Sequence, residues 1–222
     1  MIRFFDIVFS GIAIVILLPF MIPVIIGLKL TGEHDIFYLQ ERIGKKGVPF
    51  KVFKFATMMR NSSNMKGGLV TLKDDPRILP MGKFLRKTKI NELPQLINIF
   101  IGNMSIIGYR PFVKNHYDLY SDDIKSQISK IVPGLSGIGS VVFRDEEDIL
   151  HNVADPNSVH DNIITPYKGK LECWYVENRN ICNYFKLIIA TVIVVIKPKS
   201  KVWKKWFKGL PPIPENLRDY IE

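Results

Sequence analysis

The uncharged apolar run from Ile7 to Leu28 limits what this chain can fold into more than any other feature. As a straight helix with a rise of 1.5 Å per residue, the run would reach about 33 Å, enough to cross a bilayer core of about 30 Å. No cleavage site of small residues follows it, and it is longer than the apolar core of a typical signal peptide. We therefore expect a helix that remains in the membrane.

Two prolines, Pro19 and Pro23, interrupt the middle of this run. Each removes a backbone N–H and clashes with the preceding helical turn, so the sequence predicts a kink. A kinked helix can enter and leave a bilayer on the same face when the polar groups at the kink are satisfied. Arg3 before the run and Lys29 after it favour neither orientation. These residues alone leave a spanning helix and a re-entrant helix both open.

The chain of 222 residues has a formal net charge of +10, which predicts an anionic partner such as lipid head groups, nucleotide phosphates or nucleic acid. Because no recognition helix or RNA-binding motif accompanies the charge, we expect no nucleic-acid partner. The histidines lack metal-ligand spacing and there is no G-x-S-x-G motif, which disfavours a hydrolase. Cys173 and Cys182 lack the spacing of a metal or redox site and predict two ordinary reduced cysteines.

A group of charged residues between Arg86 and Arg110 carries the strongest chemical signal. Both arginines can bind a phosphate through paired hydrogen bonds, Lys89 adds a further cation, and Glu92 can hold a magnesium ion. Proline is tolerated in the first turn of a helix and not later, so the segment Asn91–Pro94 predicts a helix start whose free N–H groups would face the phosphate. The stretch therefore predicts a site that handles phosphate beside a divalent metal.

The same stretch resembles the signature of a known family. Leu85–Leu96, Gly102–Ser105 and Gly108–Pro111 are similar to the words R-x-x-x-x-D-E-L-P-Q-L, G-D-M-S and G-x-R-P of the bacterial sugar transferases, or monotopic phosphoglycosyl transferases. Similar words at Gln40–Gly44 and Pro133–Gly137 extend the resemblance over most of the chain.

The resemblance implies transfer of a sugar 1-phosphate from a UDP-sugar to undecaprenyl phosphate, with release of UMP, as the first membrane step of polysaccharide or glycoconjugate synthesis. It implies Asn91 and Glu92 as the catalytic pair, and Arg86, Lys89 and Arg110 as ligands of the substrate phosphates. It also implies Mg²⁺ as the cofactor, held by Glu92. Membrane lipids are the further partners, and a homodimer is left open.

Two residues depart from the family pattern. Asn91 stands where the family has the aspartate that forms a covalent sugar-phosphate intermediate, and Asn103 replaces the aspartate of G-D-M-S. The lone pair of an amide nitrogen is delocalised and carries no charge, so Asn91 should not form the usual acyl phosphate. As a purely structural residue, Asn91 would instead cap a helix, a role that asparagine fills as well as aspartate.

Three accounts of Asn91 remain. The chain is active by direct transfer or with Glu92 as the nucleophile; it is a natural variant of low activity or a partner subunit; or Asn91 is an engineered substitution. The loss of two acids, at Asn91 and Asn103, weakens the last account, which predicts a single change. The alternative function is therefore a catalytically impaired family member that acts as a lipid-phosphate-binding or partner-binding membrane protein.

The expected fold class is α+β and mostly helical, in three parts. Residues 1–31 would form a re-entrant membrane helix broken at Pro19, which the resemblance implies, with both ends at the cytoplasmic face of the inner membrane. Residues 32–196 would form a cytosolic catalytic domain that lies on the membrane through amphipathic helices. Residues 197–222 would form a basic and aromatic tail at the membrane surface.

Local patterns predict further elements in the first two thirds of the chain. Alternating, aromatic-rich residues at 36–40 and 48–55 predict a small strand pair joined by a turn. Residues 61–75 are polar and predict an exposed loop. The glycine-rich segment 133–137 predicts a turn whose backbone N–H groups could face a phosphate. The acidic residues 145–148 favour a solvated helix start over a metal or sugar site.

Two C-terminal patterns bear on membrane contact. The apolar run at 184–196 is too short to span a bilayer and predicts a buried or interface-lying helix. Trp203, Trp206 and Phe207 follow the i, i+3, i+4 spacing of one helix face, with lysines opposite. Such a face suits an anionic membrane surface, and the alternative is a solvated basic tail with a few residues docked on the domain.

Overall fold

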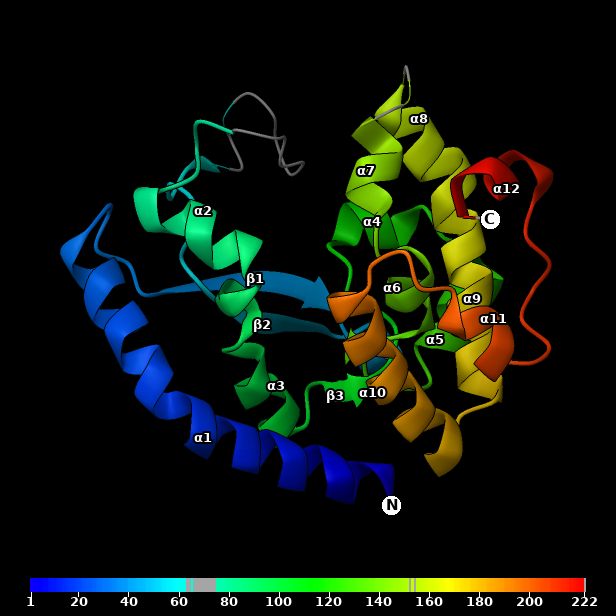
Figure 1. Cartoon of the computed structure of the whole chain (residues 1–222), viewed down its shortest axis with the longest axis horizontal. Coiled ribbons are helices and arrows are strands. Elements are labelled where there is room, and N and C mark those ends of the chain that lie inside the picture. Colours follow the sequence, from blue (N-terminus) through cyan, green and yellow to red (C-terminus); the bar gives the residue numbers. More distant parts are fainter. Residues whose placement is uncertain (63–64, 66–74, 152, 154, 222) are drawn as a thin grey trace. The chain divides into compact units, whose positions relative to one another are not determined.

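The apolar run forms one continuous helix, α1 (Ile2–Leu30), in the computed structural model of the chain. The helix continues through Pro19 and Pro23, and its ribbon curves along its length (Figure 1, blue). Among residues 1–62, 65, 75–151, 153 and 155–221, which the structure describes, α1 is the one helix long and apolar enough to cross a membrane. Its mean hydropathy and length agree with the anchor expected from the sequence.

The chain divides into two compact units. Unit 1 comprises Met1–Asp6, Arg42–Phe50 and Gly102–Glu222, and unit 2 comprises Ile7–Glu41 and Lys51–Ile101. Together their elements confirm the mostly helical α+β fold class, with a small strand pair and a long apolar N-terminal helix.

Unit 2 is built on one face of α1. Met21 and Leu28 of α1 are buried with Phe55 and Leu85, and residues on the opposite face, such as Phe20, remain exposed. The elements of this unit after the strand pair are α2 (Pro80–Lys87), the 3₁₀ turn η3 (Ile90–Glu92) and α3 (Gln95–Ile101). The exposed apolar face of α1 therefore remains available to lipid.

The predicted strand pair is confirmed as β1 (Phe37–Ile43) and β2 (Pro49–Phe55), joined through the 3₁₀ turn η1 (Lys45–Gly47). Asn98 of α3 holds β2 in place. Its Oδ1 accepts a hydrogen bond from the N–H of Phe53 at 2.9 Å, and its Nδ2 donates to the carbonyl of Lys51 at 2.8 Å. Asn98 is fully buried, and its two hydrogen bonds satisfy backbone groups of β2 that a neighbouring strand would otherwise pair with.

A second strand pair, which the sequence did not predict, lies in unit 1. β3 (Ser105–Ile107) and β4 (Gly134–Ser136) run parallel, with Ser105 opposite Gly134. The glycine-rich segment expected to be a turn is therefore mainly a strand. The N–H of Gly134 donates to the carbonyl of Tyr109, so it is not free to bind a phosphate. A Cβ on Gly134 would lie 2.1 Å from the nitrogen of Gly108, so this approach requires glycine.

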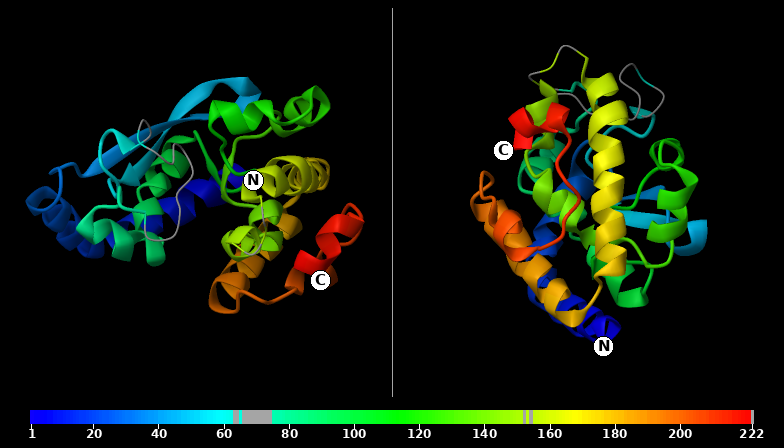
Figure 2. Two further views of the ribbon diagram at one scale, coloured as in Figure 1. Left: turned by 90° about the horizontal axis from the view of Figure 1, so that it is seen from above. Right: turned by 90° about the vertical axis from the view of Figure 1, so that its right-hand side faces the viewer.

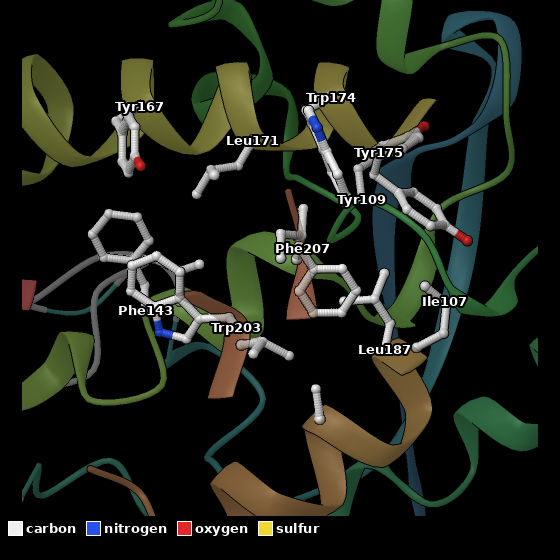
Figure 3. Close-up of a cluster of buried hydrophobic side chains, with 14 of the residues drawn as sticks. Ile107, Tyr109, Phe143, Tyr167, Leu171, Trp174, Tyr175, Leu187, Trp203 and Phe207 are labelled. Carbon is white, nitrogen blue, oxygen red and sulfur yellow. The ribbon is translucent and has the colours of Figure 1, made fainter. Parts of the chain in front are cut away.

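Helices complete unit 1 around a shared core. In chain order they are α4 (Lys114–Asp118), α5 (Asp122–Ile128), α6 (Ile138–Val142), α7 (Glu146–His151), α8 (Pro156–Val159), the π-helical turn η4 (His160–Ile164), α9 (Thr165–Glu177), α10 (Ile181–Ile196), α11 (Val202–Trp206) and α12 (Glu215–Ile221). α9 contacts α5 and α6, α10 contacts α6 and α11, and α12 contacts η4 (Figures 1 and 2). Figure 3 shows the core between them, where Leu171 and Tyr175 of α9 lie near Leu187 of α10.

The aromatic residues of the tail correct one expectation. Trp203 is 4% exposed and Phe207 is 3% exposed, because both side chains fill the core of unit 1 (Figure 3). Their orientation toward lipid, inferred from spacing alone, is wrong. Trp206 is half-buried, and the neighbouring Lys205 is exposed. A position of the remaining tail residues at the membrane surface stays a prediction.

Other local expectations have mixed outcomes. α10 confirms a helix that is buried on one face, and its other face exposes Ile189, Val192, Val195 and Ile196. Cys173 and Cys182 are free, as expected. α7 confirms a helix start at Glu146, although that side chain is half-buried and binds Lys168 at 2.5 Å. Most of the predicted loop 61–75 lies outside the described residues.

The first turns of α1 are fixed inside unit 1 by a buried carboxylate. Asp6 is 2% exposed, and its Oδ1 accepts hydrogen bonds from Ser105 Oγ at 3.0 Å and from the N–H of Ile106 at 2.9 Å. Tyr184 Oη of α10 donates to the same oxygen at 2.9 Å. The start of the apolar helix is therefore part of the core of unit 1 and not a free terminus.

Candidate active site

Four of the predicted site residues lie on one turn of unit 2. Arg86 is half-buried in the last turn of α2, and Lys89 is exposed just beyond it. Asn91 is buried in η3, and Glu92 closes η3 with a half-buried side chain. Because α2 and η3 contact one another, the structure brings two cations, an amide and a carboxylate together on one short turn.

Local sequence explains why the chain turns here. Leu85 is fully buried and fixes α2 on the core of unit 2. Thr88 is the C-cap of α2, and its Oγ1 donates to the carbonyl of Phe84 at 2.8 Å. Lys89 then adopts a left-handed conformation with φ 59°, which costs a side chain other than glycine about 1–2 kcal/mol. Residues with strained backbone conformations cluster at functional sites, so the conformation of Lys89 is consistent with a binding site here.

The predicted helix start lies slightly later than expected. α3 begins at Gln95, directly after Pro94, and not at Asn91. Proline is compatible with this position because no helical hydrogen bond needs its missing N–H, and its carbonyl accepts a hydrogen bond from the N–H of Ile97. Asn91 instead occupies the separate turn η3.

Asn91 does not cap a helix, so that interpretation is wrong. Asn91 lies inside η3, whose N-cap is Lys89, and the Oδ1 that would accept a capping bond is buried without a hydrogen-bond partner among the described residues. A buried carbonyl oxygen left in this state costs about 1–3 kcal/mol. The oxygen is an acceptor, so the partner that it lacks is a hydrogen-bond donor or a cation and not a bare phosphate oxygen.

The donor chemistry of this turn fits a magnesium ion. Glu92 and the Oδ1 of Asn91 are both oxygen ligands, which Mg²⁺ prefers. Among the described residues there is no group of three or more His, Cys, Asp or Glu side chains that could hold a metal by themselves. Magnesium commonly takes one or two protein carboxylates and completes its shell with substrate phosphates and water, so a pair of oxygen donors suffices.

Arg110 lies in the other compact unit. It is exposed and follows Tyr109, which is completely buried directly after β3. The N–H of Gly108 donates to the carbonyl of Ser136, so the backbone that carries Arg110 is fixed by the β3–β4 pair. The structure therefore groups Arg86, Lys89, Asn91 and Glu92 in unit 2 and places Arg110 in unit 1.

A buried ion pair, whose formation the sequence did not predict, holds the segment before α2. Arg77 is 2% exposed; its Nη2 lies 2.6 Å from Asp75 Oδ2, and its Nε donates to Oδ1 at 2.9 Å. Arg77 Nη1 also donates to the carbonyl of Ser62 at 2.7 Å. The paired geometry satisfies both ions and fixes the chain shortly before the helix that carries Arg86.

Sequence reasoning also missed Glu172 of α9. It is 3% exposed and receives a backbone hydrogen bond from Gly139, while its Oε2 has no partner among the described residues. A Cβ on Gly139 would lie 2.5 Å from Oε1, so the carboxyl group fills the space that this glycine leaves. The sequence carries one sign of this burial, since Glu172 lies between the apolar residues Leu171 and Trp174.

Burial raises the pKa of Glu172 to about 8, and Lys168 and the Gly139 hydrogen bond oppose the shift. The native state therefore retains a proton that the unfolded chain releases above its ordinary pKa of 4.5. The free energy of unfolding then falls as pH rises between these values, by up to about 1.4 kcal/mol per pH unit. We expect Glu172→Gln to remove this dependence.

Melting temperatures at pH 5.5, 6.5 and 7.5 test this prediction. The melting temperature of Glu172→Gln should rise relative to the unsubstituted chain at each step. A constant difference across the three values would contradict a protonated Glu172.

Comparisons with known proteins identify the family of the chain. The family model described as bacterial sugar transferase matches residues 1–198. The chain is 32% identical over 209 residues to an undecaprenyl-phosphate galactose phosphotransferase of Salmonella typhimurium, covering 88% of this chain and 40% of that protein. It is 33% identical over 151 residues to a UDP-glucose:undecaprenyl-phosphate glucose-1-phosphate transferase of Escherichia coli, covering 67% of this chain and 32% of that protein.

A shorter relative is covered more fully. The exopolysaccharide production protein ExoY of Sinorhizobium fredii is 34% identical over 166 residues, which are 68% of this chain and 73% of that protein. The chain spans about two fifths of the length of the larger relatives that it matches. The family match nevertheless includes α1, the turn with Arg86 and Glu92, and the segment with Arg110. The chain belongs to the bacterial sugar transferase family.

Proposed function

We propose that this chain transfers a sugar 1-phosphate from a UDP-sugar to undecaprenyl phosphate and releases UMP. The names of relatives from Salmonella and Escherichia specify undecaprenyl phosphate as a substrate, with galactose or glucose as the sugar. The observation that carries the proposal is the turn from α2 to α3. It carries Arg86, Lys89 and Glu92 on the same short stretch as Asn91, whose side-chain oxygen is buried and unpartnered among the described residues, within the family match.

The reaction is a displacement at the β-phosphorus of the UDP-sugar. The bond between this phosphorus and the oxygen that links it to the α-phosphorus breaks, and UMP leaves with the electron pair. Negative charge spreads over the phosphoryl oxygens, so fixed cations stabilise the transition state. Arg86 and Lys89 of unit 2 are the proposed cations, and Arg110 stays a predicted phosphate ligand.

Glu92 is the proposed nucleophile because the amide of Asn91 cannot serve. One carboxylate oxygen of Glu92 would bond to the β-phosphorus, giving an acyl phosphate and free UMP. A phosphate oxygen of the lipid would then attack the same phosphorus, and the acyl-phosphate bond would break to restore the carboxylate. Mass spectrometry after incubation with a UDP-sugar distinguishes this route, which leaves an adduct on Glu92, from direct transfer, which leaves none.

Magnesium is the proposed cofactor. When bound, it would neutralise charge on the diphosphate and help UMP to leave. The residues of this chain that would hold it are Glu92 and Asn91, the latter through its buried Oδ1. Asn91 therefore has a proposed role, as a neutral ligand, that does not require it to be a nucleophile.

Asn91→Asp should increase UMP release by about tenfold or more. The substitution keeps the shape of the side chain and adds a negative charge at the buried oxygen that is the proposed metal ligand. It also restores the nucleophile that the family uses. Asn103→Asp is the matched control, because Asn103 also departs from the family pattern but is exposed. An Asn91→Asp variant with unchanged or lower activity would argue against this assignment of the site.

UMP release tests the function itself. Membranes that contain the chain should release UMP from at least one member of a panel of UDP-sugars when undecaprenyl phosphate is supplied, with UDP-glucose and UDP-galactose tested first. If neither the chain nor Asn91→Asp releases UMP from any of them, the alternative gains support. That alternative, favoured by the missing acid at Asn91, is a protein that binds lipid phosphate without turnover.

The chain is a membrane protein, and we propose a monotopic placement at the cytoplasmic face of the inner membrane. A spanning α1 would put its two ends on opposite sides of the bilayer. Residues 1–6, however, belong to unit 1 together with residues 102–222, and Asp6 is bonded there to Ser105 and Tyr184. No helix of spanning length follows α1 in the described part of the chain, so a re-entrant α1 accounts for these contacts.

Cysteine labelling of intact cells tests this topology. With Cys173 and Cys182 replaced by serine, an Ile2→Cys variant should not react with an impermeant maleimide until the cells are lysed. A variant that retains only the exposed Cys182 is the control for the cytoplasmic side. Reaction of Ile2→Cys in intact cells would overturn the re-entrant arrangement.

A further inference from the structure

An open groove of about 530 Å³ lies on unit 1, between the end of α9, α10 and α11. It is separate in sequence from every residue of the candidate active site. The lining residues that matter here are three lysines, two tryptophans and one isoleucine: Lys186, Lys205, Lys208, Trp174, Trp206 and Ile189. Among the described residues that line the groove there is no acidic side chain, so its charge favours an anion.

The aromatic floor of the groove is fixed by the core of unit 1. The rings of Trp174 and Phe207 meet edge to face with centroids 5.9 Å apart, and both side chains are buried (Figure 3). Asn178 Nδ2 donates to the carbonyl of Trp174 at 2.9 Å, which fixes the end of α9. Above this floor, Lys205 and Lys208 are exposed at the rim. A rigid apolar floor with a cationic rim suits a ligand that is both charged and apolar.

An apolar strip leads out of the groove along α10. Ile189 lines the groove and is 50% exposed, and Val192 and Ile196 follow it on the same helix face with exposures of 52% and 71%. A free inorganic anion would make no use of this strip. An acyl chain whose head group carries a phosphate would cover it, and α1 already holds the chain at a bilayer that supplies such lipids.

We propose that this groove binds the head group of an anionic bilayer phospholipid. Lys186, Lys205 and Lys208 contact the phosphate, Trp206 lies at the level of the glycerol, and an acyl chain follows the strip from Ile189. Charge complementarity and the continuity between the lysines and the strip select this occupant. The proposal does not depend on transfer activity.

A titration of the full chain in neutral detergent tests the groove. Dihexanoyl phosphatidylglycerol should produce a saturable change in tryptophan fluorescence, which Trp206→Phe reduces, and dihexanoyl phosphatidylcholine should bind at least about tenfold more weakly. The double variant Lys205→Gln/Lys208→Gln should weaken phosphatidylglycerol binding by about tenfold or more, because each loses a charge-assisted contact. UMP release measured in the same detergent should be unchanged in this double variant.

The matched control changes the net charge by the same amount. Lys199→Gln/Lys201→Gln removes two exposed lysines from the same segment but outside the groove, and should change affinity by less than about twofold. Equal weakening by both double variants would show a general charge effect and overturn the proposal. Binding of inorganic phosphate or of farnesyl phosphate as tightly as phosphatidylglycerol would also overturn it, since the occupant would then not be a bilayer phospholipid.

Discussion

Glu92→Gln is expected to reduce UMP release by about 10³-fold or more, which is the size of effect seen when a nucleophile is removed. Glutamine keeps the length and shape of the side chain but carries an uncharged amide. In the proposed mechanism it can neither bond to the β-phosphorus nor neutralise a cation. Because Asn91 is already an amide, no carboxylate would then remain on the turn from α2 to α3.

The control for this prediction is Glu215→Gln, an equal change of charge at an exposed residue of α12, outside the family match. It should retain full activity. Melting temperatures of both variants separate a loss of chemistry from a loss of folding. An active Glu92→Gln enzyme would show that neither the proposed nucleophile nor the proposed metal ligand is correct.

Asp6→Ala is expected to lower the free energy of unfolding by about 3 kcal/mol, since it leaves buried donors on Ser105, Ile106 and Tyr184 without their acceptor. For a chain of this size, that loss corresponds to a fall in melting temperature of roughly 6–12 °C. The substitution acts at the start of the membrane helix, yet the affected partners lie about 100 and 178 residues away in the sequence.

Tyr184→Phe supplies a graded comparison, because it removes one donor and leaves the carboxylate bonded to Ser105 and Ile106. We expect a loss of about 1 kcal/mol for it. Tyr38→Phe removes a hydroxyl from an exposed tyrosine and should be neutral. If Asp6→Ala melts within about 1 °C of the unsubstituted chain, the start of α1 is not held in unit 1, and the main support for the re-entrant topology is lost.

The features that the sequence predicted well are those with local causes. α1 follows from a long uncharged run, and the β1–β2 pair follows from alternating aromatic residues on either side of Gly44 and Gly47. The helix start that Pro94 indicates also has a local cause, although α3 begins only at Gln95.

The features that the sequence did not predict depend on distant partners. β3 and β4 have three residues each, too few to show a periodicity, and their pairing joins Ser105 to Gly134. Glu172 lies in a helix whose burial is decided by contacts with α5 and α6. Helical spacing placed Trp203 and Phe207 on one face but could not specify whether that face meets lipid or the core.

The role of Asn91 in the candidate site also depends on structure that the sequence does not specify. The sequence identified the position and its conflict with an acyl-phosphate mechanism. Whether the side chain caps a helix depends on the backbone around it, and the structure has the amide oxygen buried and unpartnered in η3 instead. The structure therefore leaves open which donor or cation this oxygen binds, and a magnesium ion held with Glu92 is the proposal made above.

The most direct test of the proposed function follows the phosphorus atom. The chain would be incubated with a UDP-sugar that carries ³²P at the β-phosphate and with undecaprenyl phosphate, and the lipid would then be extracted. Sugar 1-phosphate transfer predicts that the label appears in the lipid in a one-to-one ratio with released UMP. Label that stays in the aqueous phase, for every UDP-sugar of the panel, would contradict transferase activity in this chain.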